Sequence, residues 1–136
     1  MANYSLDSSI VIEILRQNPV VIRRLEETKN TDKHYICSIV YYEIMRGFNC
    51  ENHTRKINAF QTLYENVGHL FFDRENFKVI YEASKIYRKL KSTGSMIDEN
   101  DIYIAAISMV NDCTLVTANT RHFERLEGLN FVNWRD

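Results

Sequence analysis

The chain has 136 residues with 17 Lys and Arg, 18 Asp and Glu, a formal net charge of −1 and 45% hydrophobic residues. This balance excludes intrinsic disorder, and the low counts of 4 Gly and 1 Pro exclude collagen-like and low-complexity sequence. The neutral total argues against the broadly basic surface of many nucleic-acid-binding proteins, although a local basic patch stays compatible with it.

The first half of the chain alternates short strand-like runs with longer helical runs. Strands are predicted over residues 3–6 and 34–38, and helices over residues 10–16, 20–27, 39–48 and 54–66. The β-branched residues of the run 10–16 suit a strand as well as a helix. Ser38 is the expected N-cap of the helix that follows it.

The second half of the chain continues this alternation. Strands are predicted over residues 69–72, 114–117 and 131–134, and helices over residues 75–93 and 98–111. The first of these helices is expected to bury one stripe, made of Phe77, Ile80, Ala83, Ser84 and Tyr87. The second helix has few polar positions and is expected to be deeply buried, with an acidic start that complements the helix dipole.

Strands that alternate with helices predict parallel pairing through helical crossovers. We therefore expect an α/β fold over residues 1–136 as a single domain. Its architecture would be a three-layer α/β/α sandwich around a central, mostly parallel sheet of four to five strands. Functional sites of such folds lie outside the carboxyl ends of the strands, near the point where the strand order reverses.

Four polar residues are predicted to lie near that edge of the sheet. Asp7 and Asn119 follow strands, Asp101 opens the buried helix, and Glu43 lies five residues after the second strand. Taken singly, each has a structural explanation as a helix cap, a solvated position, a helix start or a turn residue. Taken together they predict a cluster of carboxylates, whose mutual repulsion a hard divalent cation such as Mg²⁺ or Mn²⁺ would relieve.

Five segments carry a family resemblance, in order along the chain: residues 6–9 (LDSS), 38–47 (SIVYYEIMRG), 94–106 (GSMIDENDIYIAA), 115–123 (LVTANTRHF) and 128–134. With these segments the sequence resembles PIN-domain ribonucleases, and more narrowly the VapC-type toxins of bacterial toxin–antitoxin pairs. The resemblance implies a PIN-like fold and metal-dependent endoribonuclease activity.

Residue by residue, the resemblance implies that Asp7, Glu43 and Asp101 are catalytic and bind Mg²⁺ or Mn²⁺. Asn119 stands where many relatives have a fourth acid and others have an Asn. Asp98 is either a further ligand or a helix cap. Ser9 stands where the family usually has Asn, which removes an amide beside Asp7.

The resemblance also assigns supporting residues and partners. Ser8 and Ser38 are supporting residues of the site, and Arg46, Arg121 and His122 are candidate contacts to RNA, with solvated surface positions as the alternative. The expected substrate is tRNA or another structured RNA. The expected partners are a cognate VapB-like antitoxin and a second copy of the chain.

Three widely spaced cysteines, Cys37, Cys50 and Cys113, argue against a disulfide framework or a cysteine zinc site. Together with the absence of a signal peptide or a bilayer-spanning run, they predict a cytoplasmic protein without membrane contact. Two rival functions remain: a catalytically weak or inactive PIN-fold module that binds RNA or protein, which Ser9 and Asn119 leave open, and a PIN nuclease without an antitoxin.

Overall fold

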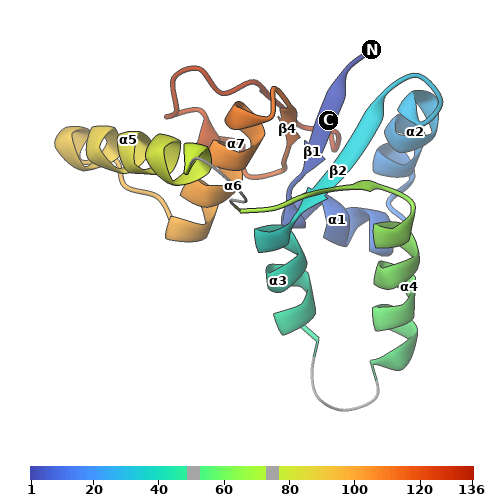
Figure 1. Ribbon diagram of the computed structural model, residues 1–136. Helices are drawn as coiled ribbons and strands as arrows, with labels where there is room; N and C mark the ends of the chain where they lie inside the picture. The colour runs from blue at the N-terminus through green and yellow to red at the C-terminus, as the bar shows by residue number, and fades with distance from the viewer. Residues whose placement is uncertain (49–52, 73–76) are drawn as a thin grey trace.

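The computed structural model describes residues 1–48, 53–72 and 77–136 and contains a five-stranded sheet (Figure 1). The strands are β1 (Asn3–Leu6), β2 (Lys33–Cys37), β3 (Gly68–Leu70), β4 (Thr114–Val116) and β5 (Phe131–Val132). Their spatial order is β3-β2-β1-β4-β5, and every neighbouring pair is parallel. The predicted α/β class and the parallel sheet are therefore confirmed.

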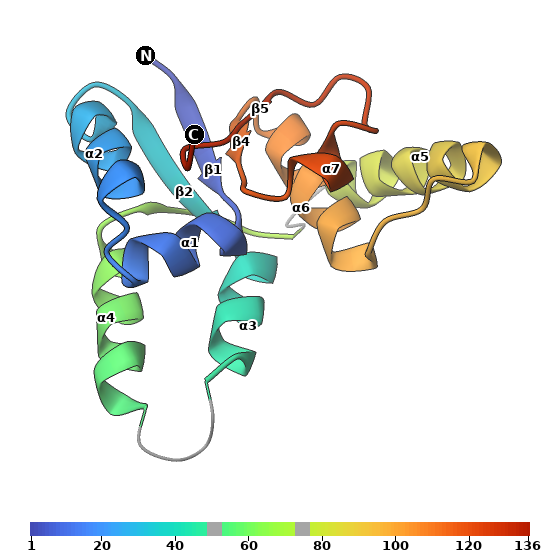
Figure 2. The same cartoon turned by 180° about the vertical axis from the view of Figure 1, so that it is seen from behind.

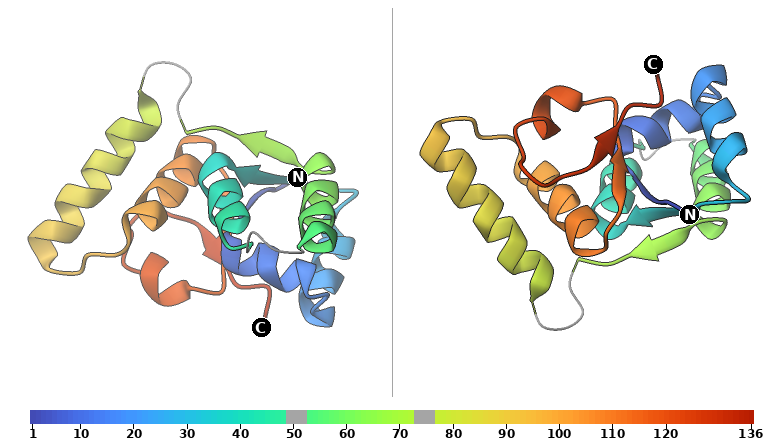
Figure 3. Two further views of the ribbon diagram at one scale, coloured as in Figure 1. Left: turned by 90° about the horizontal axis from the view of Figure 1, so that it is seen from below. Right: turned by 90° about the horizontal axis from the view of Figure 1, so that it is seen from above.

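Helices cover both sides of the sheet. They are α1 (Ser8–Leu15), α2 (Pro19–Thr28), α3 (Ser38–Arg46), α4 (Thr54–Glu65), α5 (Lys78–Thr93), α6 (Glu99–Val110) and the short α7 (Thr120–Phe123). Figure 3 shows α1, α2 and α4 on one side of the strands and α5 and α6 on the other, with α5 outermost. The view from behind in Figure 2 shows the start of α1 close to the start of α3.

Helix α6 is the central buried helix, as its composition predicts. Its residues 101–102 and 104–108 are buried, so the helix is enclosed on nearly all sides. Among the described residues, no helix is long and apolar enough to cross a membrane.

The predicted stripe of α5 is confirmed only at Ala83, and the buried face of the helix is rotated by about one residue from it. The buried side chains are Val79, Ala83, Ile86 and Leu90. Ile80 and Tyr87 are 40% and 44% exposed, and Phe77 precedes the helix in a left-handed conformation. Both sets of residues have helical spacing, so the sequence pattern alone does not choose between them; packing against α6 does. Residues 75 and 76 of the predicted helix lie outside the described residues.

Three local predictions also need correction. Ser38 is the first residue of α3 rather than its N-cap; Cys37 holds the cap position, without a side-chain cap. The third strand ends at Leu70 instead of residue 72. Helix α7 was not predicted, because four polar and aromatic residues after a strand resemble a turn.

The direction in which successive strands are added to the sheet reverses at β1. From β1 the sheet extends to β2 and β3 on one side and to β4 and β5 on the other. Leu6 pairs with Val116, so the next residues along the two strands, Asp7 and Thr117, leave the sheet side by side. This edge is where a site is expected in a parallel sheet.

Candidate active site

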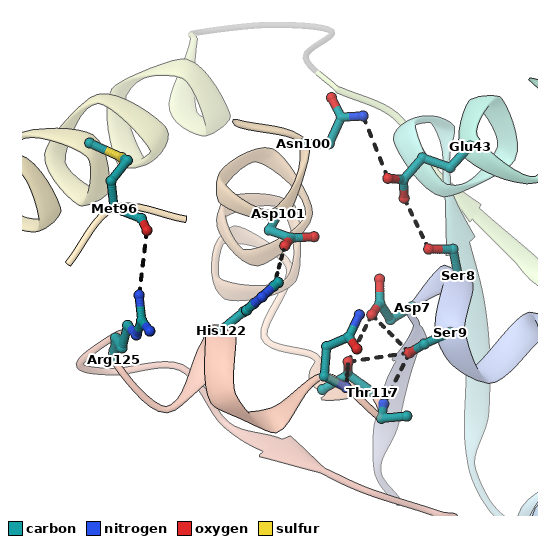
Figure 4. A network of polar contacts seen from close by, with 12 residues as sticks. Asp7, Ser8, Ser9, Glu43, Met96, Asn100, Asp101, Thr117, His122 and Arg125 are labelled. Atoms are coloured by element: carbon teal, nitrogen blue, oxygen red, sulfur yellow. Dashed lines mark hydrogen bonds and ion pairs between the residues drawn. The ribbon is translucent and has the colours of Figure 1, made fainter. Parts of the chain in front are cut away.

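Asp7 is a buried carboxylate held by two hydroxyl groups. It lies between β1 and α1 and is 1% exposed. Its Oδ2 atom accepts hydrogen bonds from Thr117 Oγ1 at 2.7 Å and Ser9 Oγ at 3.1 Å (Figure 4). Its side chain makes no cap to α1, and its Oδ1 atom is buried without a hydrogen-bond partner. The explanation of Asp7 as a simple helix cap is therefore wrong.

This environment changes the acidity of Asp7. Burial raises the pKa of Asp7 from 3.8 to about 6, because the charged form loses its hydration. The hydroxyl of Thr117 opposes the rise, whereas the negative charge of Asp101 adds to it. Asp7 and Asp101 are thus close enough to interact electrostatically, as expected of two acids in one site.

Asp101 lies in the first turn of α6 and is 8% exposed. Its Oδ2 atom lies 2.8 Å from Nδ1 of His122, which comes from α7 (Figure 4). Burial raises the pKa of Asp101, while the contact with His122 lowers it and the nearby charge of Asp98 raises it further. His122 therefore reaches the candidate site through Asp101.

Glu43 connects three helices at the same place. Its Oε1 atom accepts a hydrogen bond of 3.0 Å from Ser8 Oγ at the start of α1. Its Oε2 atom lies 3.5 Å from Asn100 Nδ2 on α6 and 3.8 Å from Arg46 on its own helix. Ser8 follows Asp7 in the sequence, and Asn100 precedes Asp101. These two contacts therefore hold the Glu43 side chain near both acids (Figure 4).

The chemistry of these donors fits a hard divalent cation that keeps part of its water shell. In the described parts of the chain, no group of three or more His, Cys, Asp or Glu side chains is placed so that it could hold a metal ion. The buried, unpartnered Oδ1 of Asp7 is an oxygen that a cation would satisfy. Mg²⁺ is commonly bound by one or two carboxylates with water in its remaining positions.

The other predicted residues lie around these three acids. Asp98 and Asn119 are exposed at the cap positions of α6 and α7, and neither side chain caps its helix. Arg46 and Arg121 are exposed. Ser38 Oγ is buried without a hydrogen-bond partner, so its supporting role stays a prediction.

Sequence reasoning missed Thr117 and Asn100. Thr117 Oγ1 binds Asp7 and also accepts a hydrogen bond of 2.9 Å from the backbone N–H of Asn119. The sequence did offer one signal for Thr117: it follows β4 directly, just as Asp7 follows β1. Ser9 donates to Asp7 and accepts from the backbone N–H of Ala118 at 3.0 Å, so this short side chain joins α1 to the end of β4.

Cys37 lies near Asp7 and Glu43, but its thiol is not suited to act as a nucleophile. The side chain is fully buried, and this burial raises the pKa of the thiol to about 11. A protonated thiol is a poor nucleophile and a poor metal ligand. Cys37 and Cys113 are free, and Cys50 lies outside the described residues.

Comparison with known proteins identifies relatives along nearly the whole chain. A family model described as the PIN domain matches residues 4–129. Ribonuclease VapC1 of Methanocaldococcus jannaschii is 35% identical over 122 residues, which cover 90% of this chain and 79% of the relative. Ribonuclease VapC1 of Haemophilus influenzae strain R2866 is 29% identical over 133 residues, covering 96% of this chain and 97% of the relative.

Solved structures agree with these relatives. The structure of VapBC-1 from nontypeable Haemophilus influenzae matches with a TM-score of 0.85 and 26% identity, covering 98% of this chain and 99% of that chain. DNA-bound VapBC from Salmonella typhimurium matches with a TM-score of 0.86 at 21% identity, covering 98% and 99%, which shows the shared fold.

Proposed function

This chain belongs to the PIN-domain family, among the VapC ribonucleases, and we propose that its Asp7, Glu43 and Asp101 form the site that hydrolyses RNA with a bound Mg²⁺ or Mn²⁺. The observation that carries this assignment is the buried, unpartnered Oδ1 of Asp7 beside a second buried acid. The charge of Asp101 raises the pKa of Asp7, and a divalent cation would relieve this repulsion and attract a phosphodiester.

Each acid has a distinct task in this proposal. Asp7 and Asp101 hold the cation, directly or through water. Glu43, less buried and fixed by Ser8, orients a water molecule and accepts its proton. The bound cation would supply hydroxide at neutral pH and stabilise the charge on the phosphoryl group and the leaving oxygen.

The residues at the rim have supporting roles. The side chains of Arg46 and Arg121 are exposed and would contact the phosphates of the RNA backbone. Asp98 and Asn119, exposed beside the starts of α6 and α7, would bind water held by the cation. We expect one nuclease domain acting in the cytoplasm, where tRNA and other structured RNA are available.

We also propose that a cognate VapB-like antitoxin inhibits this ribonuclease and that the chain forms a homodimer. The solved relative named VapBC-1 supports the first expectation. Ile12, Val20 and Tyr42 on α1, α2 and α3 are 39%, 43% and 56% exposed, and such apolar side chains suit a protein partner.

Expression of the chain in bacteria tests this function in cells. Wild type alone should arrest growth and produce new RNA fragments. Asp101→Asn, which keeps the side-chain shape but removes the negative charge, should do neither at equal protein level. Co-expression of the antitoxin should restore growth of the wild type. Harmless expression of folded wild type, or arrest by Asp101→Asn, would contradict the proposal.

A further inference from the structure

The contact between Asp101 and His122 has a defined direction. An ionised carboxylate only accepts hydrogen bonds, so at 2.8 Å from Asp101 Oδ2 the Nδ1 atom of His122 carries the hydrogen. The Nε2 atom is the other nitrogen of the ring, and the His122 side chain is 42% exposed. One nitrogen therefore binds an acid of the site while the ring remains accessible to solvent.

Helix α7 fixes the place of this ring. The next residue, Phe123, is fully buried in the core, and Leu126 is 7% exposed. The backbone N–H of His122 donates to the carbonyl of Asn119 at 3.1 Å. The backbone around His122 is thus anchored on the core side, and its side chain is presented to α6 (Figure 4).

The same segment also holds the other buried acid. Thr117 engages Oδ2 of Asp7, and His122, five residues later, engages Oδ2 of Asp101. In each contact, one carboxylate oxygen accepts a hydrogen bond from a side chain of this segment. One oxygen of each acid is therefore held by the protein, and the orientation of its second oxygen is set.

We propose that His122 is a positioning residue for cation binding: its Nδ1–H group orients the carboxylate of Asp101. This inference rests on the proposed function and assigns His122 a task other than contact with RNA. Partners that hydrogen-bond to a metal-binding carboxylate typically contribute about 10- to 100-fold to metal affinity or activity. Loss of the Nδ1 donor should weaken cation binding by a factor in that range.

Two amide substitutions separate this task from RNA contact. In His122→Asn the side-chain amide nitrogen lies near the position of Nδ1, so it can still donate to Asp101. In His122→Gln the amide reaches the position of Nε2 instead. Asn should therefore retain cation affinity, and Gln and Ala should lose it. If His122 instead contacts RNA through Nε2, His122→Gln should keep the wild-type KM for RNA and His122→Asn should raise it. Cation affinity would then be unchanged in both variants.

The test is calorimetric titration of Mn²⁺ into the purified full chain without RNA, followed by cleavage kinetics. Expected results are a Mn²⁺ Kd raised about 10- to 100-fold in His122→Ala and His122→Gln, and a near wild-type Kd in His122→Asn. Higher Mn²⁺ concentration should restore cleavage by the two weakened variants. His69→Ala, which removes an exposed histidine from β3, is the matched control and should bind Mn²⁺ like wild type.

Equal Mn²⁺ affinity in all folded variants would overturn the inference, as would loss in His122→Asn with retention in His122→Gln. Circular dichroism establishes that each variant is folded; if His122→Ala is not, the Asn and Gln pair decides. If the wild type binds Mn²⁺ and cleaves RNA, and the His122 variants do so equally well, only the role of His122 is refuted. A wild type that binds no Mn²⁺ refutes both this role and the proposed function.

Discussion

Asp7, a residue of the proposed site, destabilises the fold. A carboxylate that is 1% exposed loses its hydration, and two hydroxyl donors compensate at only one of its oxygens. An unsatisfied buried polar atom costs about 1–3 kcal/mol or more if it is charged. The residue is thus better suited to binding a cation than to stabilising the fold.

The stability of the cation-free protein should fall as pH rises from about 4 to about 6. The pKa of Asp7 is raised to about 6 in the folded protein from 3.8, so the folded state holds its proton more tightly than the unfolded chain. Below both pKa values the carboxyl group is protonated in both states, so the penalty for burying its charge is absent. Above both, its buried charge destabilises the fold by on the order of 3 kcal/mol.

Urea unfolding of wild type and Asp7→Asn in EDTA measures this cost. The variant should match wild type near pH 4 and be more stable near pH 7, because Asn is neutral at both pH values. Asp136→Asn, at the exposed chain end, should show no such gain. Parallel pH profiles for wild type and Asp7→Asn would rule out the effect.

Thr117→Val tests the hydrogen bond that holds Asp7. Valine has nearly the shape of threonine but lacks the O–H group that donates to Oδ2 at 2.7 Å. We expect a loss of about 10- to 100-fold in cleavage rate at fixed Mg²⁺, as for other outer-shell donors. Thr117→Ser keeps the hydroxyl and should retain most activity. Undiminished cleavage by Thr117→Val would exclude the role.

At the scale of elements, helix α5 is oriented by its packing against α6. Leu90 is 1% exposed, whereas Tyr87, in the predicted stripe, is 44% exposed. Residues of α5 and α6, among them Tyr87 and Tyr103, line a surface hollow of about 430 Å³. The apolar residues of α5 thus divide between a core face and an exposed face.

Leu90→Ala and Tyr87→Ala measure which face stabilises the fold. The first should lower the free energy of unfolding by about 2–5 kcal/mol, because it leaves a cavity in the core. The second should cost about 1 kcal/mol or less, as at other largely exposed positions. Urea denaturation gives both values, and the reverse order would contradict the packing of α5.

The order of strands and helices could be predicted from the sequence because periodicity and breakers are local signals. All five strands and the helices through α6 lie near their predicted ranges. The rotation of α5 could not be predicted, since it depends on a helix that follows it in sequence. The hydrogen bonds of Thr117 and His122 were also missed, because they depend on side chains 110 and 21 residues away.

At the scale of the whole molecule, the proposed site is assembled from segments across the chain. Asp7 follows β1, Glu43 lies on α3 after β2, and Asp101 opens α6. Thr117 directly follows β4, and His122 lies on α7. The central position of β1 in a parallel sheet brings these segments to one edge. No single segment contains the proposed site, which lies at the edge where a parallel sheet is expected to hold one.

The most direct test of this account is cleavage of total cellular RNA by the purified protein with Mg²⁺, with Mn²⁺ and with EDTA, beside Asp7→Ala. We predict discrete new fragments that require a divalent cation and are absent with EDTA and with folded Asp7→Ala. Mapping the fragment ends would identify the RNA target. Equal cleavage by wild type in EDTA, or by Asp7→Ala, would contradict a cation-dependent site at Asp7.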